Sequence, residues 1–97
     1  MRTKDEILAI LRRELPRLRE EFAVDTLALF GSYARGEQGE DSDVDVLVEF
    51  VETVDFIEFM RLEFHLSDLL SLKVDLVTPD ALRPVMRDDI LGSAVHA

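Results

Sequence analysis

The sequence predicts a single α/β (α+β) domain in which helices flank a small mixed sheet of three to four strands. In two long stretches, apolar residues recur every three or four positions, which is the spacing of an amphipathic helix. Short apolar runs rich in Val and Leu lie between these stretches, as buried strands do. No linker divides the chain of 97 residues, so we expect residues 1–97 to form one domain.

The first helix is expected to begin at Thr3, because Thr3 followed by Glu6 has the form of a capping box. Pro16 lacks a backbone donor and clashes with the preceding turn, so the helix is expected to kink or restart near it. The apolar stripe of this helix consists of Ile7, Leu8, Leu11, Leu15, Leu18 and Phe22.

Three strands are expected, at residues 26–30 (TLALF), 43–50 (DVDVLVEF) and 73–78 (KVDLVT). Between the first two, residues 32–36 (SYARG) fit one helical turn. Residues 37–42 (EQGEDS) have the glycine and acid content of an exposed loop. The connection between these strands is therefore expected to be short and partly helical.

A second long helix is expected after Asp55, which with Glu58 fits the start of a helix. Its buried stripe is expected to consist of Phe56, Phe59, Leu62, Leu66 and Leu69. Three further apolar residues widen this surface, namely Ile57, Met60 and Phe64. They fit a surface for a partner or for self-association as well as they fit the core, which leaves a homo-oligomer open.

A short C-terminal helix is expected after the third strand, because Thr78 suits an N-cap and Pro79 suits the first helical position. Its apolar residues are Leu82, Val85, Ile90 and Leu91. The expected order is helix, strand, helical turn, strand, helix, strand and helix.

The composition excludes several classes of function. The formal net charge of -10 repels phosphate backbones, so an extended nucleic-acid-binding surface is not expected, although a metal ion could still bring in one nucleotide. The chain has no cysteine, hence no disulfide and no thiol nucleophile. No apolar run is long enough to span a membrane, and the N-terminal residues MRTKDEIL do not resemble a signal peptide. We therefore expect a cytoplasmic protein without a membrane partner.

Three aspartates stand where buried strands are expected. Strand side chains alternate, so Asp43 and Asp45 face the same side, roughly 6.5–7 Å apart along the backbone. Asp75 repeats this pattern between Val74 and Leu76. Carboxylates this close repel one another, and a hard cation such as Mg²⁺ offsets the repulsion. If the third strand lies beside the second, the carboxylates converge on one metal site. Solvent-facing aspartates on an edge strand are the alternative, disfavoured because Asp is rare in strands.

Gly31 and Ser32 end the first strand and open into the helical turn. Glycine has no Cβ, so a phosphate can approach its backbone closely. Ser32 adds a hydroxyl and begins a turn whose free N–H groups favour an anion. An ordinary strand-ending turn is the alternative. For Arg35, an ion pair with Glu37 or Asp41 fits as well as a phosphate contact.

Several other polar and aromatic residues are not expected to be catalytic. His65 lies on a predicted helix without a metal-ligand partner, and His96 lies one residue from the last position. Tyr33, the only tyrosine, is expected to have a packing role, and a position beside a bound nucleotide is the alternative. The arginines of the first helix are expected to form a solvated face, namely Arg12, Arg13, Arg17 and Arg19.

The segments GSYARG, SDVDVLVEF and KVDLVT, in this order, resemble the minimal nucleotidyltransferase family of the DNA-polymerase-beta-like superfamily. That family has a Gly-Ser pair, a gap of about ten residues, Asp-x-Asp and a later Asp on another strand. The resemblance covers nearly the whole chain and implies a polymerase-beta-like palm. The matching positions are Gly31, Ser32, Asp43, Asp45 and Asp75.

The resemblance implies a Mg²⁺-dependent nucleotidyltransferase that acts as an antitoxin. Such a protein moves AMP from ATP onto a hydroxyl, typically of a tyrosine, of a HEPN-domain ribonuclease toxin. By this analogy Asp43, Asp45 and Asp75 bind two magnesium ions, and Asp75 is also the base. Gly31 and Ser32 would bind the ATP phosphates, and Arg35, on the short turn, would support this loop or a phosphate.

The sequence is also compatible with two rival functions. The first is the same chemistry on a small hydroxyl-bearing molecule such as an antibiotic, against which the lack of a second domain counts. The second is an antitoxin that neutralises its toxin by covering it, without catalysis. The intact set of aspartates weighs against the second rival, because a pure binder has no need of clustered carboxylates.

Overall fold

The computed structural model describes residues 2–97, which form helices and strands in the expected order with one additional strand. The elements are α1 (Lys4–Phe22), β1 (Val24–Phe30), α2 (Gly31–Arg35), β2 (Val44–Phe50), α3 (Phe56–Leu70), β3 (Val74–Val77), the 3-10 helix η1 (Pro79–Ala81), α4 (Pro84–Ser93) and β4 (Val95–His96). Among these helices, none is both long and apolar enough to cross a membrane.

The four strands form one mixed sheet in the order β3-β2-β1-β4. β1 is antiparallel to β2 and to β4, whereas β2 and β3 are parallel and are joined through α3. This confirms the predicted small mixed sheet. β4 was not predicted, because two residues that pair only with Ala28 and Leu29 leave no periodic pattern in the sequence.

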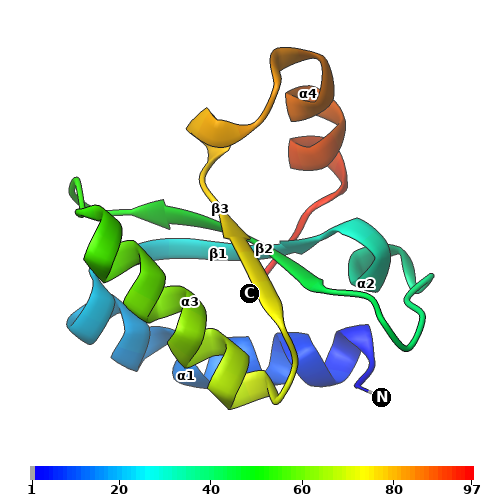
Figure 1. The fold of residues 1–97 in the computed structure, drawn as a ribbon, viewed down its shortest axis with the longest axis horizontal. Coiled ribbons are helices and arrows are strands. Elements are labelled where there is room, and N and C mark those ends of the chain that lie inside the picture. The colour runs from blue at the N-terminus through cyan, green and yellow to red at the C-terminus, as the bar shows by residue number, and fades with distance from the viewer. Residues whose placement is uncertain (1) are drawn as a thin grey trace.

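The core lies between one face of the sheet and the two long helices. α1 and α3 lie side by side across this face (Figure 1). On β2, alternate side chains enter the core, so Val44, Val46 and Val48 are completely buried. The helices contribute the stripes that meet them, including Ile7, Leu11, Leu18, Leu62, Leu66 and Leu70. The intervening residues of β2 therefore face the opposite side of the sheet.

The predicted starts of the two long helices are confirmed by capping hydrogen bonds. The Thr3 hydroxyl accepts a hydrogen bond from the backbone N–H of Glu6, and the Asp55 carboxylate accepts one from the N–H of Glu58. Of the two outcomes expected at Pro16, a kink or a restart, the restart does not occur, because α1 continues through this residue. Pro16 lies on the exposed side of the helix, where water can satisfy the carbonyl that loses its partner.

The predicted buried stripe of α3 is wrong at its first position. Phe56 is 74% exposed, because it lies at the very start of the helix, beyond the cover of the sheet. Leu70, rather than the half-buried Leu69, completes the buried stripe. Ile57 and Phe64 are 70% and 62% exposed, so this wider apolar surface is not part of the core of the domain.

The segment after β3 differs from its prediction in detail. Thr78 and Pro79 begin a single 3-10 turn instead of a continuous helix, and α4 begins at Pro84. The interruption has a local cause, since Arg83 precedes a proline and adopts the extended backbone that this position favours. α4 has no fully buried residue, and it packs on the domain less closely than the other helices do.

Candidate active site

Asp45 and Asp75 lie directly beside each other on neighbouring parallel strands. The register pairs Asp45 of β2 with Asp75 of β3, and neighbouring strands are about 4.8 Å apart. Both side chains point away from the core, because the residues on either side of each are buried. The expectation that the third strand lies beside the second is therefore confirmed, and it places two carboxylates at one point of the open sheet face.

Asp43 lies just before β2 and not within it, although its spacing from Asp45 places it near the same face. Its Oδ2 atom is 3.8 Å from Nζ of Lys73, the residue that precedes β3. The Lys73 side chain is 80% exposed, so this ion pair contributes little to stability. Lys73 is the nearby cation that sequence reasoning missed, since its position only becomes informative once β2 and β3 are known to be neighbours.

The electrostatics of Asp45 reflect this clustering. Burial raises the pKa of the Asp45 carboxyl above its usual value, and the neighbouring charges of Asp75 and Asp43 raise it further. Arg35 acts in the opposite direction and lowers this pKa. The charges of Asp75, Asp43 and Arg35 thus all act on the pKa of Asp45 in the folded protein.

The backbone of Gly31 fits closely against Asp45. Phe30, the last residue of β1, is paired with Asp45 across the sheet, and Gly31 follows with φ at +75°. A Cβ atom on residue 31 would overlap Oδ2 of Asp45. Glycine is therefore required here by its backbone conformation and by the space that the carboxylate occupies. This contact joins the Gly-Ser turn and the aspartates into one site.

The other residues of α2 have distinct surroundings. Ser32 is half-buried and follows Gly31 directly in α2. Nε of Arg35 is 3.1 Å from Oε2 of Glu37, so the ion pair with Glu37 that was one of the two expectations for this arginine is present. Tyr33 is only 1% exposed and belongs to the hydrophobic core, as predicted.

Two side chains of α3 hold the outer edge of β3 on either side of Asp75. Oε2 of Glu63 accepts a hydrogen bond of 2.8 Å from the N–H of Leu76, and Oγ of Ser67 accepts one of 3.1 Å from the N–H of Val74. These contacts replace the missing neighbour of an edge strand. Sequence reasoning missed both residues, although two polar residues four positions apart on an apolar helix face are a usable signal.

The donor set fits a hard cation in kind, since carboxylate oxygens on one sheet face are the ligands that Mg²⁺ prefers. Within residues 2–97, however, no three His, Cys, Asp or Glu side chains are arranged as a ready-made metal site. Asp43 is the member whose carboxylate is engaged elsewhere, with Lys73. The part of the expected site that the structure shows assembled is the Asp45–Asp75 pair, with the backbone of Gly31 packed against Asp45.

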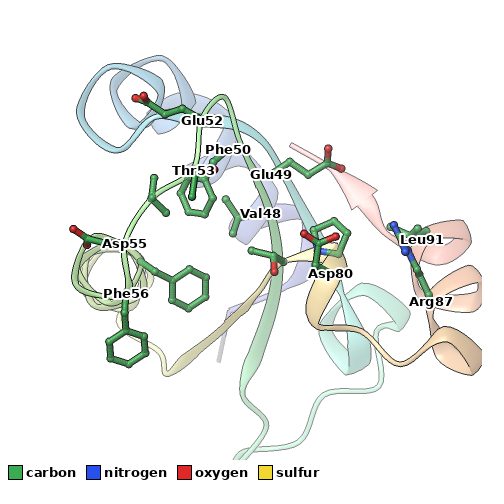
Figure 2. A pocket seen from close by; sticks show the side chains of 14 residues that line it. Val48, Glu49, Phe50, Glu52, Thr53, Asp55, Phe56, Asp80, Arg87 and Leu91 are labelled. Atoms are coloured by element: carbon green, nitrogen blue, oxygen red, sulfur yellow. The ribbon is translucent and has the colours of Figure 1, made fainter.

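A separate pocket of about 830 Å³ opens at the other end of β2. It lies between the start of α3, the end of β2, η1 and α4. Figure 2 shows Phe56 and Asp55 on the α3 side and Arg87 and Leu91 on the α4 side. None of the aspartates at positions 43, 45 and 75 lines it.

Comparisons with known proteins agree with this arrangement. The family model described as nucleotidyltransferase domain matches residues 8–96. A Methanocaldococcus jannaschii protein named as a candidate protein adenylyltransferase is 53% identical over 97 residues, with 99% of each chain covered. The protein adenylyltransferase MntA of Thermococcus cleftensis is 44% identical over 96 residues, covering 99% of this chain and 97% of that protein.

Solved structures give the same result. A candidate minimal nucleotidyltransferase matches with a TM-score of 0.80 at 34% identity, covering 97% of this chain and 95% of the other. A toxin–antitoxin structure with AMP-PNP matches with a TM-score of 0.67 at 28% identity, covering 96% of this chain and 70% of the other. With the Gly-Ser turn and the paired aspartates in place, the chain belongs to the nucleotidyltransferase family, in its minimal nucleotidyltransferase branch.

Proposed function

We propose that this protein is an antitoxin that transfers AMP from ATP to a hydroxyl group, of a tyrosine in particular, on a partner HEPN toxin. The observation that carries the proposal is the pairing of Asp45 with Asp75 beside the close-fitting Gly31. Relatives support the choice of reaction and partner. One is the MntA adenylyltransferase of Thermococcus cleftensis, and another structure contains a tri-AMPylated HEPN toxin of Shewanella oneidensis with its MNT antitoxin.

Asp43, Asp45 and Asp75 are proposed to hold magnesium, two ions in the fully loaded site. When bound, magnesium would neutralise the triphosphate and the developing charge on the attacking and leaving oxygens. Burial raises the pKa of Asp45, and repulsion from Asp75 and Asp43 raises it further; a cation would relieve this repulsion. Closing the set requires the Asp43 carboxylate to turn from Lys73.

The remaining roles follow from position. The acceptor oxygen attacks the α-phosphorus, the bond between the α-phosphorus and the bridging oxygen breaks, and pyrophosphate leaves. Asp75, exposed on the open sheet face, is the proposed acceptor of the hydroxyl proton. Gly31 and Ser32 are proposed to hold the phosphates of ATP, with Arg35 supporting the loop through Glu37.

Mass spectrometry of the partner toxin tests the proposal. The toxin is produced alone, with the wild-type protein and with an Asp43→Asn/Asp45→Asn variant, and its mass is measured. We expect added AMP only with the wild-type protein, and neutralisation of the toxin only where AMP is added. If the variant neutralises the toxin equally well, the protein acts by covering its partner. Transfer of AMP to a small hydroxyl compound, with none to the toxin, would instead support a nucleotidyltransferase that modifies small molecules.

A further inference from the structure

The pocket at the end of β2 has a surface suited to a cationic and apolar chain. Three phenylalanines line it, Phe50, Phe56 and Phe59, and Phe56 is 74% exposed. Phe50 and Phe59 pack against each other with ring centroids 6.4 Å apart. Figure 2 shows the Phe56 ring at the start of α3, facing outward from the core. Such rings bind aliphatic groups and also the cations of arginine and lysine.

The rim of the pocket is acidic. Four exposed carboxylates line it, those of Glu49, Glu52, Asp55 and Asp80, against the single cation of Arg87. Within residues 2–97, Glu49 and Asp80 take part in none of the side-chain ion pairs. Their charges are therefore free to act on a ligand. An acidic rim around aromatic rings favours a basic and apolar ligand and disfavours an anionic one.

The pocket lies on the acceptor side of the proposed reaction. Gly31 lies against Asp45 near the start of β2, Asp75 lies beside Asp45, and the pocket lies at the opposite end of this strand. Figure 1 shows α2 near one end of β2 and the start of α3 beyond the other. In phosphoryl transfer, the attacking and leaving oxygens lie roughly in line across the phosphorus. If pyrophosphate leaves toward Gly31, the acceptor hydroxyl must enter from the side of the pocket.

The distance between the carboxylates and the pocket matches the length of a short extended peptide. From Asp45 to Glu49 the strand advances by four residues, about 13 Å, and from Asp75 to Thr78 by three, about 10 Å. A chain in extended conformation covers the same distance in three to four residues. A residue held in the pocket would therefore place a hydroxyl three or four positions away near the carboxylates.

We propose that this pocket is the docking site for a segment of the protein acceptor that carries basic and apolar side chains about three to four residues from the modified hydroxyl. The inference rests on the proposed function and adds to it a rule for acceptor recognition. A nucleoside is the competing occupant. The in-line argument and the distance of the pocket from the Gly-Ser turn favour the peptide.

The test uses two labelled peptides with one central tyrosine. The basic peptide has Leu and Arg at three and four positions on both sides of the tyrosine, and the acidic peptide has Glu in place of Arg. Peptide binding is measured by fluorescence anisotropy without ATP, affinity for MgATP by calorimetry, and AMP transfer to the partner toxin with labelled ATP. The variants are Glu49→Lys/Asp80→Lys and the milder Glu49→Gln/Asp80→Asn. The matched control, Glu20→Lys/Asp68→Lys, makes the same change of charge at exposed positions outside this pocket.

We expect the wild-type protein to bind the basic peptide at least about tenfold more tightly than the acidic one. The lysine variant should lose this preference, the amide variant should lose part of it, and the control should keep it. Affinity for MgATP should be unchanged in all. The proposal is overturned if wild type shows no preference, if the lysine variant keeps it, or if the lysine variant loses affinity for MgATP, which would assign the pocket to the nucleoside.

The same experiment separates the two proposals. If wild type prefers the basic peptide but transfers no AMP to the toxin, the proposed function fails and the docking site stands. If the lysine variant modifies the toxin at the wild-type rate, the docking site fails and the proposed function stands.

Discussion

The Gly31→Ala substitution tests whether the turn after β1 must lie against the Asp45 carboxylate. The added Cβ would lie 3.0 Å from Cγ and 3.2 Å from Cβ of Asp45, and it would overlap Oδ2. Either the carboxylate or the turn must then move, by something on the order of 1 Å. A displacement of this size in a catalytic group lowers the rate by about 100-fold. In activation free energy this is about 2.7 kcal/mol.

The same substitution also lowers stability, for a reason unrelated to the site. Residue 31 has φ at +75°, where a residue with a Cβ costs roughly 1–2 kcal/mol. For a domain of this size each kcal/mol lowers the melting temperature by roughly 4–8 °C. Loss of activity must therefore be distinguished from partial unfolding.

Gly36→Ala is the matched control. Gly36 has a similar φ of +71°, but a Cβ there would have no atom within 4 Å. We expect both variants to lose roughly 1–2 kcal/mol of stability in thermal melts, and only Gly31→Ala to lose about 100-fold in the initial rate of AMP transfer from labelled ATP to the toxin. Equal activity of the two variants at a temperature where both are folded would show that the contact of Gly31 does not position the Asp45 carboxylate for transfer.

Three further predictions concern the side chains around the carboxylates. Asp45→Asn should raise the melting temperature at neutral pH while abolishing transfer, because the pKa of Asp45 is raised in the folded protein. Proton binding at Asp45 favours the fold below the unfolded-state pKa, and this contribution is lost as pH rises through the folded-state pKa. The advantage of the variant should therefore shrink in acid, and melts across the acidic range would show the opposite trend if the shift had the other sign. Glu63→Leu should cost about 1–3 kcal/mol in urea unfolding, because the N–H of Leu76 loses its acceptor, whereas Glu63→Gln keeps an acceptor oxygen and should stay near wild type. Lys73→Met should change the unfolding free energy by less than about 0.5 kcal/mol, because the pair with Asp43 is exposed, and a larger loss would mean that this ion pair is structural.

Much of the fold could be predicted because the core stripes are continuous. The residues of α1 follow helical spacing from Ile7 to Leu18, and the Val-rich face of β2 is buried as its alternation required. The failures occur where local pattern does not determine burial. Phe56 has the spacing of a buried residue, but its exposure depends on where the sheet ends, which local spacing does not encode.

The candidate site, too, could be predicted from the sequence only in part. The positions of Asp45 and Asp75 could be predicted from an aspartate between buried residues on each strand, and their register followed once the strands were neighbours. The contact of Gly31 with Asp45 could not, because it depends on the pairing of Phe30 with Asp45 across the sheet. The pocket was missed for a related reason, since it is assembled from four elements separated in sequence.

The proposed function rests on the claim that the carboxylates at positions 43, 45 and 75 bind magnesium, which in turn binds the phosphates of ATP. Calorimetric titration with ATP, once with magnesium and once with EDTA, measures this binding for the wild-type protein and for Asp45→Asn, Asp75→Asn and Asp80→Asn. We predict magnesium-dependent binding to wild type and to Asp80→Asn, because residue 80 lies in the separate pocket, and a loss of about tenfold or more in the other two. Equal affinity in all four proteins, or binding that is indifferent to EDTA, would contradict the claim.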